Sequence, residues 1–214
     1  MRVLVVTAVA AEAGSVTEGL TGIGTSPVVD VVTAGAGPAA AAATAATALA
    51  LGSYDLVVSA GIGGGFQPHA PVGSVVVADA IIAADLGADT PDGFLPVDEL
   101  GFGRSVHRPP PELSARVAKA LDAVYAPVLT VSTVTGTAAR AAELSGRHPR
   151  AAAEAMEGFG VAEAAAAHSV PVLEIRAISN PVGPRDRAAW RIGQALDSLR
   201  YAFQLLAPVL EETP

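Results

Sequence analysis

A chain of 214 residues, 51% of them hydrophobic, can bury one substantial core, so we expect a single domain over residues 1–214. The formal net charge of −8 argues against a nucleic-acid partner, because phosphate backbones would be repelled. The absence of cysteine excludes disulfides and thiolate metal sites, and the four histidines are too scattered to pair on one helix face, so we expect no metal and no cofactor.

The sequence also argues against a membrane. No apolar run approaches the roughly 20 residues that cross a bilayer. The N-terminus "MRVLVVTAVAAEAG" lacks the order of basic region, apolar region and cleavage site that marks a signal peptide. We therefore expect a cytoplasmic protein.

Segments rich in Val and Ile recur along the chain with helical stretches between them. The strands expected from this pattern cover residues 2–10, 28–35, 54–61, 73–82, 126–134 and 171–179. Helices are expected at 38–51, 111–125, 137–147 and 158–168, with a last helix that begins near Pro184 and Asp186 and continues to residue 212. This alternation predicts an α/β fold.

Residues 84–110 depart from the pattern. They are crowded with Gly, Pro and Asp and have no strong periodicity. A connection of this length is usually functional or covers a neighbouring surface.

Two glycine segments, at 35–37 and 61–65, follow expected strands. "GAGPAA" from Gly35 has the spacing of a weak dinucleotide fingerprint, although that fingerprint belongs at the first strand, which here ends without a glycine pair. The glycines equally fit loops that bring backbone N–H groups close to a ligand, or loops that only turn tightly.

Polar side chains stand at several of the expected strand ends. Glu12 follows the first strand and Asn180 follows the last. In open α/β sheets ligands bind outside the carboxyl ends of the strands, so these residues can converge on one site. Glu157 directly precedes a helix, where its carboxylate can also serve only to compensate the helix dipole.

The ordered set "TAVAAEA", "TAGAGPAAAA", "SAGIGGGF" and "EAMEGFGVAEAAAAHSVPVLEIRAIS" followed by Asn180 resembles the nucleoside phosphorylase and nucleosidase superfamily. The resemblance covers nearly the whole chain except 84–110 and is strongest to the methylthioadenosine/S-adenosylhomocysteine nucleosidases. Within that branch, "ISNPVGPRDRAAW" is similar to the futalosine hydrolases of the alternative menaquinone pathway. The resemblance implies a three-layer α/β/α fold with a central twisted mixed sheet.

The resemblance also implies roles for individual residues. Glu12 would activate the attacking water, Glu157 would bind the ribose hydroxyls with Met156 packed against the sugar, and Arg176 would help to hold the nucleophile. The remaining substrate-binding residues that it implies are Ala36, Gly61, Ile62, Gly63, Thr133 and Val134.

Asn180 bears on the identity of the base. Adenine-specific relatives carry an aspartic acid at this position, whereas an amide offers an NH2 to a 6-oxo group and a carbonyl to a protonated N7. A mismatched buried partner costs about 1–3 kcal/mol. Asn180 therefore indicates that the base is hypoxanthine or guanine. The resemblance places a small residue, Ala36, beside the 5′ carbon of the ribose, which indicates a bulky substituent on that carbon. Futalosine has both features: a hypoxanthine base and an aryl ketone acid at the 5′ carbon.

We expect an arginine to bind the carboxylate of this substituent. The candidates, among which the sequence does not choose, are Arg104, Arg108, Arg185 and Arg187. The resemblance implies a homo-oligomer in which residues 84–110, with His107, Phe94 and Phe102, contribute to the neighbouring site. Ile62, where adenine nucleosidases have a serine, favours hydrolysis over phosphorolysis. An adenine nucleosidase, a phosphorylase and a nucleoside-binding module without turnover are the alternatives.

Overall fold

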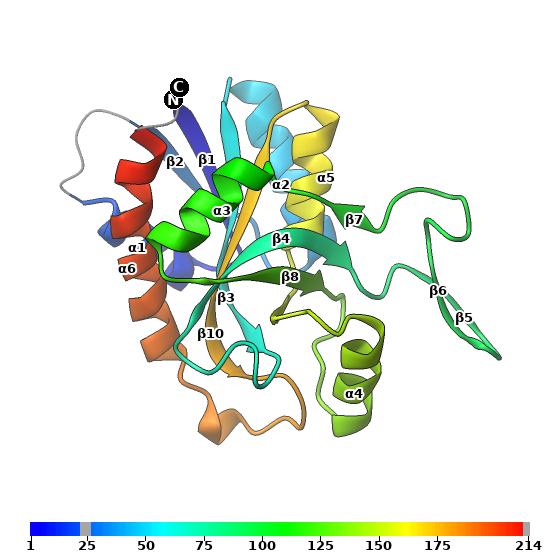
Figure 1. Cartoon of the computed structure of the whole chain (residues 1–214). Helices are drawn as coiled ribbons and strands as arrows, with labels where there is room; N and C mark the ends of the chain where they lie inside the picture. Colours follow the sequence, from blue (N-terminus) through cyan, green and yellow to red (C-terminus); the bar gives the residue numbers. More distant parts are fainter. Residues whose placement is uncertain (22–26, 212–214) are drawn as a thin grey trace.

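The computed structural model describes residues 1–21 and 27–211 and has a central sheet between two layers of helices (Figure 1). Within these residues one eight-stranded mixed sheet contains β1 (Arg2–Thr7), β2 (Val28–Thr33), β3 (Leu56–Gly65), β4 (Val75–Ala83), β7 (Val106–His107), β8 (Val124–Thr130), β9 (Ala153–Ala155) and β10 (Val172–Pro181). The three-layer α/β/α prediction is confirmed.

Part of the sheet closes on itself. The strand order is β10-β4-β8-β9-β3-β1-β2, and β10 also pairs with β3, so that five strands form a ring. β10 lies parallel to β3 and antiparallel to β4. This closure brings the ends of β3, β9 and β10 together, which the alternation of strands and helices does not predict.

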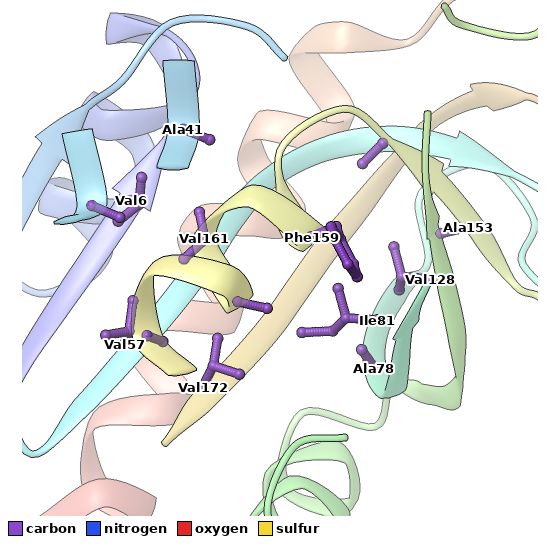
Figure 2. Close-up of a cluster of buried hydrophobic side chains, with 14 of the residues drawn as sticks. Val6, Ala41, Val57, Ala78, Ile81, Val128, Ala153, Phe159, Val161 and Val172 are labelled. Carbon is purple, nitrogen blue, oxygen red and sulfur yellow. The ribbon is translucent and has the colours of Figure 1, made fainter. Parts of the chain in front are cut away.

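The two faces of the sheet can be read from β1, in which alternate side chains point to opposite sides. Leu4 and Val6 belong to a core with α2 (Pro38–Leu51) and α5 (Gly158–Ala167). In that core Phe159 of α5 lies near Ile81 and Val128 (Figure 2), and Val161 of the same helix belongs to the same cluster.

Val3 and Val5 belong to the core on the opposite face. The helices on that side are α1 (Ala10–Gly19), α3 (Pro111–Ala120) and the long C-terminal α6 (Ile192–Glu211). α4 (Ala138–Arg147) lies at one end of the molecule, and its N-cap Thr137 accepts a hydrogen bond from the N–H of Arg140 at 3.2 Å. The helix expected at 137–147 is therefore confirmed.

We expected a loop at the glycine segment 61–65, and this was wrong. The segment forms the second half of β3. Its glycines are there because other chain segments come too close for a side chain: a Cβ on Gly63 would lie 2.8 Å from the carbonyl oxygen of Glu154, and one on Gly65 would lie 2.1 Å from that of Ala70. Gly35 and Gly37, by contrast, have φ of 92° and 99° and do turn the chain.

Two helix boundaries were also wrong. The helix expected at 111–125 ends at Ala120, because Val124 and Tyr125 pair with β4. The last helix begins at Ile192, after a short 3-10 turn at Arg187–Ala189, and its expected final residue, 212, lies outside the described residues.

Residues 84–110 contain structure that the sequence did not predict. β5 (Gly87–Thr90) and β6 (Gly93–Pro96) form a hairpin that projects away from the body of the molecule (Figure 1). The short β7 that follows returns the chain to the edge of β4.

Candidate active site

A cavity of about 260 Å³ opens beside the ends of β1, β3, β9 and β10. Its wall contains Glu12, Glu157 and Asn180, which are far apart in sequence. Met156, Ile62, Gly63 and Val134 also line it, as expected from the sequence.

Glu12 is positioned by backbone N–H groups. It occupies the first turn of α1, where its Oε2 accepts hydrogen bonds from the N–H groups of Ala8 at 3.0 Å and Val9 at 3.1 Å. Its Oε1 accepts from the N–H of Ile62 on β3 at 2.9 Å. The side chain is only 3% exposed, so the carboxylate is fixed at the cavity wall with little freedom to turn.

Glu157 is the N-cap residue of α5 and is 6% exposed. Its Oε1 accepts from the N–H of Gly37 at 3.2 Å, which ties the 35–37 turn to the cavity. Its Oε2 accepts from Arg176 Nη1 at 3.1 Å.

Arg176 lies beneath the cavity and is fully buried. Its Nε donates to Glu174 Oε1 at 2.9 Å and its Nη2 donates to Ser59 Oγ at 2.9 Å, in addition to the bond to Glu157. Burial opposes the charge, but the carboxylates of Glu174, Glu157 and Glu12 outweigh it and raise the pKa of Arg176. The guanidinium thus supports the carboxylate of Glu157 and does not line the cavity.

Asn180 is the second-last residue of β10, and two hydrogen bonds orient its amide. Its Nδ2 donates to the carbonyl oxygen of Pro181 at 3.0 Å, and its Oδ1 accepts from Ser179 Oγ at 2.8 Å. One N–H and one lone pair of the amide stay free for a ligand.

Glu154 is a site residue that the sequence reasoning missed. It lines the cavity from β9 at 5% exposure and accepts from the N–H of Thr135 at 2.8 Å and from Thr135 Oγ1 at 2.5 Å. Burial raises the pKa of Glu154, and the two Thr135 donors limit the rise. The available signal was a second acidic residue three positions before Glu157 in the run "AAAEAMEG".

Trp190 and Arg185 form a further part of the cavity wall. The guanidinium carbon of Arg185 lies 5.1 Å from the centre of the Trp190 ring. Arg185 is the one of the four candidate arginines that lines the cavity. The guanidinium carbon of Arg187 lies 5.9 Å from the centre of the same ring, and Nε of Arg104 lies 3.9 Å from Oε1 of Glu163.

Several residues expected at the site lie elsewhere. Ala36, Gly61, Thr133 and Arg176 do not line the cavity. Thr133 is exposed and lies beyond the end of β8 at Thr130, although the next residue, Val134, does line the cavity. Gly61 lies just behind Glu12, where a Cβ would be 2.6 Å from Oε1.

His107 and Phe94, expected to reach a neighbouring site, contact their own chain. His107 is 8% exposed, because its Nε2 lies 2.7 Å from Glu163 Oε1 and its ring packs 5.1 Å from that of Phe159. Phe94 lies beneath the guanidinium of Arg147, 4.4 Å from it.

Across residues 1–21 and 27–211 no group of three or more His, Asp or Glu side chains is arranged to hold a metal ion. Over the same residues no helix has the length and apolar character needed to cross a membrane.

Sequence comparison connects this cavity to known enzymes. The family model of the phosphorylase superfamily matches residues 7–211. The futalosine hydrolase of Streptomyces coelicolor is 61% identical over 228 aligned residues, which cover 99% of this chain and 97% of that protein. The futalosine hydrolase of Acidothermus cellulolyticus is 48% identical, with 95% of this chain and 89% of that protein covered.

Solved structures share the fold at low identity. The futalosine hydrolase of Helicobacter pylori superposes with a TM-score of 0.83 at 15% identity, covering 100% of this chain and 98% of that one. A methylthioadenosine/S-adenosylhomocysteine nucleosidase of Colwellia psychrerythraea, in complex with adenine, superposes with a TM-score of 0.81 at 23% identity, covering 99% and 95%. The chain therefore belongs to the phosphorylase superfamily and, within it, to the futalosine hydrolases.

Proposed function

We propose that the cavity hydrolyses the N-glycosidic bond of futalosine, releasing hypoxanthine and dehypoxanthine futalosine in the alternative menaquinone pathway. The observation that carries this proposal is the meeting of Glu12, Glu157 and Asn180 at one cavity. Cleavage of this bond builds positive charge on the sugar and negative charge on the purine, so it needs a base, a partner for the cation and a partner for the leaving group.

Glu12 is the general base in this mechanism. Three backbone N–H groups hold its two oxygens: Oε2 accepts two of them, and Oε1, which accepts one, keeps a lone pair with which to orient and deprotonate a water. Because those donors fix the carboxylate in advance, little reorganisation accompanies proton transfer.

Glu157 binds the ribose 2′ and 3′ hydroxyls. Its carboxylate faces the cavity while Arg176 and the Gly37 N–H hold it from behind. Charge-assisted hydrogen bonds to the hydroxyls orient the ring, and the negative charge favours the developing oxocarbenium ion.

Asn180 binds the departing hypoxanthine. Its free N–H and lone pair match the 6-oxo group and a protonated N7.

Arg185 and Trp190 are assigned to the 5′ substituent. Trp190 offers an aromatic face to the aryl group, and Arg185 has no carboxylate partner among the described residues, so it is available for the substrate's carboxylate.

Water, and not phosphate, is the proposed nucleophile. All three guanidinium nitrogens of Arg176 already donate to protein acceptors and the residue is fully buried, so it offers no anion site in the cavity. Ile62 contributes an N–H to Glu12 but has no hydroxyl for a phosphate.

The test is to incubate the purified protein with futalosine, inosine and methylthioadenosine, each with and without phosphate, and to separate the products. We expect hypoxanthine from futalosine at a rate independent of phosphate. Phosphate-dependent cleavage would indicate that the protein is a phosphorylase and not a hydrolase. Release of adenine alone would indicate an adenine nucleosidase. Binding without turnover of all three would indicate a nucleoside-binding module.

Two further properties belong to this proposal. A homo-oligomer is supported by the projecting hairpin and by the exposure of Phe102 and Leu95, at 83% and 37%. A cytoplasmic location and a single domain over residues 1–214 stay predictions, which cell fractionation and limited proteolysis test.

A further inference from the structure

Three residues form a row across one wall of the cavity. Glu154 on β9 is paired with Gly64 on β3, and Gly64 is paired with Asn180 on β10. Residues paired directly across neighbouring strands share one face of a sheet, and all three line the cavity. Since neighbouring strands are about 4.8 Å apart, the Cα atoms of Glu154 and Asn180 are separated by roughly 10 Å.

Glycine keeps the middle of this row open. A Cβ on Gly64 would lie 2.9 Å from Cγ2 of Val182 and 3.4 Å from Nδ2 of Asn180. The row therefore has a carboxylate at one end, backbone without a side chain in the middle, and an amide at the other end.

The edge of a 6-oxopurine has a matching order of groups. N1–H is a donor, O6 is an acceptor and N7 is an acceptor, one after another along a single edge. A carboxylate has about four lone-pair sites, and Thr135 occupies two of those on Glu154, which leaves acceptors for an N1–H. A 6-aminopurine has an unprotonated N1, and this would place a lone pair against the carboxylate.

We propose that Glu154 is a specificity-determining residue that accepts a hydrogen bond from N1–H of the hypoxanthine base, while the base edge passes over Gly64 and Asn180 contacts O6 and N7 at the other end of the row. This inference rests on the proposed function, because it takes a 6-oxopurine nucleoside as the substrate. It assigns the rejection of adenine to two residues at opposite ends of the base edge.

The test compares kcat/KM for futalosine and for the same nucleoside carrying adenine. In Glu154→Gln an amide N–H can face N1 of adenine, so the ratio should shift toward the adenine nucleoside by about ten- to a hundredfold. The matched control is Thr135→Val, which removes the hydroxyl that Glu154 binds but leaves the carboxylate. In that variant kcat/KM should change by the same factor for both nucleosides.

An unchanged ratio in Glu154→Gln, with both substrates slowed equally, would overturn the inference and leave the proposed function intact. Binding of the free bases by calorimetry gives a readout independent of turnover. Wild type should bind hypoxanthine at least tenfold more tightly than N1-methylhypoxanthine, and Glu154→Gln should lose that preference; equal affinity of wild type for the two bases would refute the role of Glu154. If wild type does not turn over futalosine, the proposed function fails, and these base affinities still decide the role of Glu154.

Discussion

At the scale of single residues, the site depends on how its carboxylates are held. Glu12 is held by backbone N–H groups, Glu157 by an arginine and a backbone N–H, and Glu154 by Thr135. Carboxylates with different partners in one cavity can serve different purposes, because each set of partners fixes a different orientation.

Glu12→Gln should lower kcat by about 100- to 10,000-fold while KM changes little, because an amide cannot abstract the proton of the water. The amide keeps the size of the side chain, and its oxygen can still accept from the N–H groups of Ala8 and Val9, so that only the acceptor for the Ile62 N–H is lost with the base. Steady-state release of hypoxanthine measures the effect. Turnover within threefold of wild type would exclude Glu12 as the base.

Asn180→Asp should move the preference toward adenine nucleosides by about ten- to a hundredfold. The new carboxyl group can accept from the exocyclic amine of adenine and, when protonated, can donate to N7, at the cost of the N–H that now donates to the carbonyl oxygen of Pro181 at 3.0 Å. Competition between the two nucleosides in one reaction measures the shift, and an unchanged preference for hypoxanthine would show that other groups recognise the base.

Glu154 also predicts a dependence of stability on pH. Its folded-state pKa is raised above the ordinary value of 4.5, mainly by burial, so the folded protein binds this proton more tightly than the unfolded chain does. Its contribution to stability is therefore complete below pH 4.5 and is lost as the pH rises through the raised pKa. Relative to Glu154→Gln, wild type should lose free energy of unfolding from pH 4.5 upward, as measured by urea denaturation. A difference that stays constant with pH would contradict the shift.

At the scale of elements, the close packing of two helices explains why residue 160 is a glycine. α2 and α5 cover the same face of the sheet, and α5 carries both Phe159 of the core and the N-cap Glu157 of the site. A Cβ on Gly160 would lie 2.0 Å from the carbonyl oxygen of Pro38, the first residue of α2. The position of Glu157 thus depends on how closely these two helices approach.

Gly160→Ala should lower the free energy of unfolding by about 1–3 kcal/mol, because the backbone of Pro38 cannot turn aside as a flexible side chain would. The matched control is Gly146→Ala in α4, where no heavy atom lies within 4 Å of the new Cβ. That change should be neutral or stabilising by less than about 1 kcal/mol. Equal effects of the two substitutions would show that the helix contact imposes no constraint.

At the scale of the whole molecule, the β5–β6 hairpin stands apart from the three layers (Figure 1). Replacing Leu95 and Phe102 by serine should reduce the molecular mass measured by light scattering to that of a monomer, because both side chains are exposed within residues 84–110, Leu95 on β6 and Phe102 beyond it. The control is Leu51→Ser, an 85% exposed leucine at the end of α2, which should leave the mass unchanged. A wild-type protein that is already monomeric at micromolar concentration would refute the oligomer.

The sequence alone determined the fold class and brought Glu12, Glu157 and Asn180 forward as candidates, because strand patterns and short motifs are local properties of the chain. It left the choice among four arginines open, misread residues 61–65 as a loop and missed Glu154. The extension of β3 through residues 61–65 depends on the pairing of β10 with β3, and the position of Glu154 depends on the pairing of β9 with β3 at Gly64. Only the tertiary structure decided them, because the register between strands a hundred residues apart is set by packing across the whole sheet.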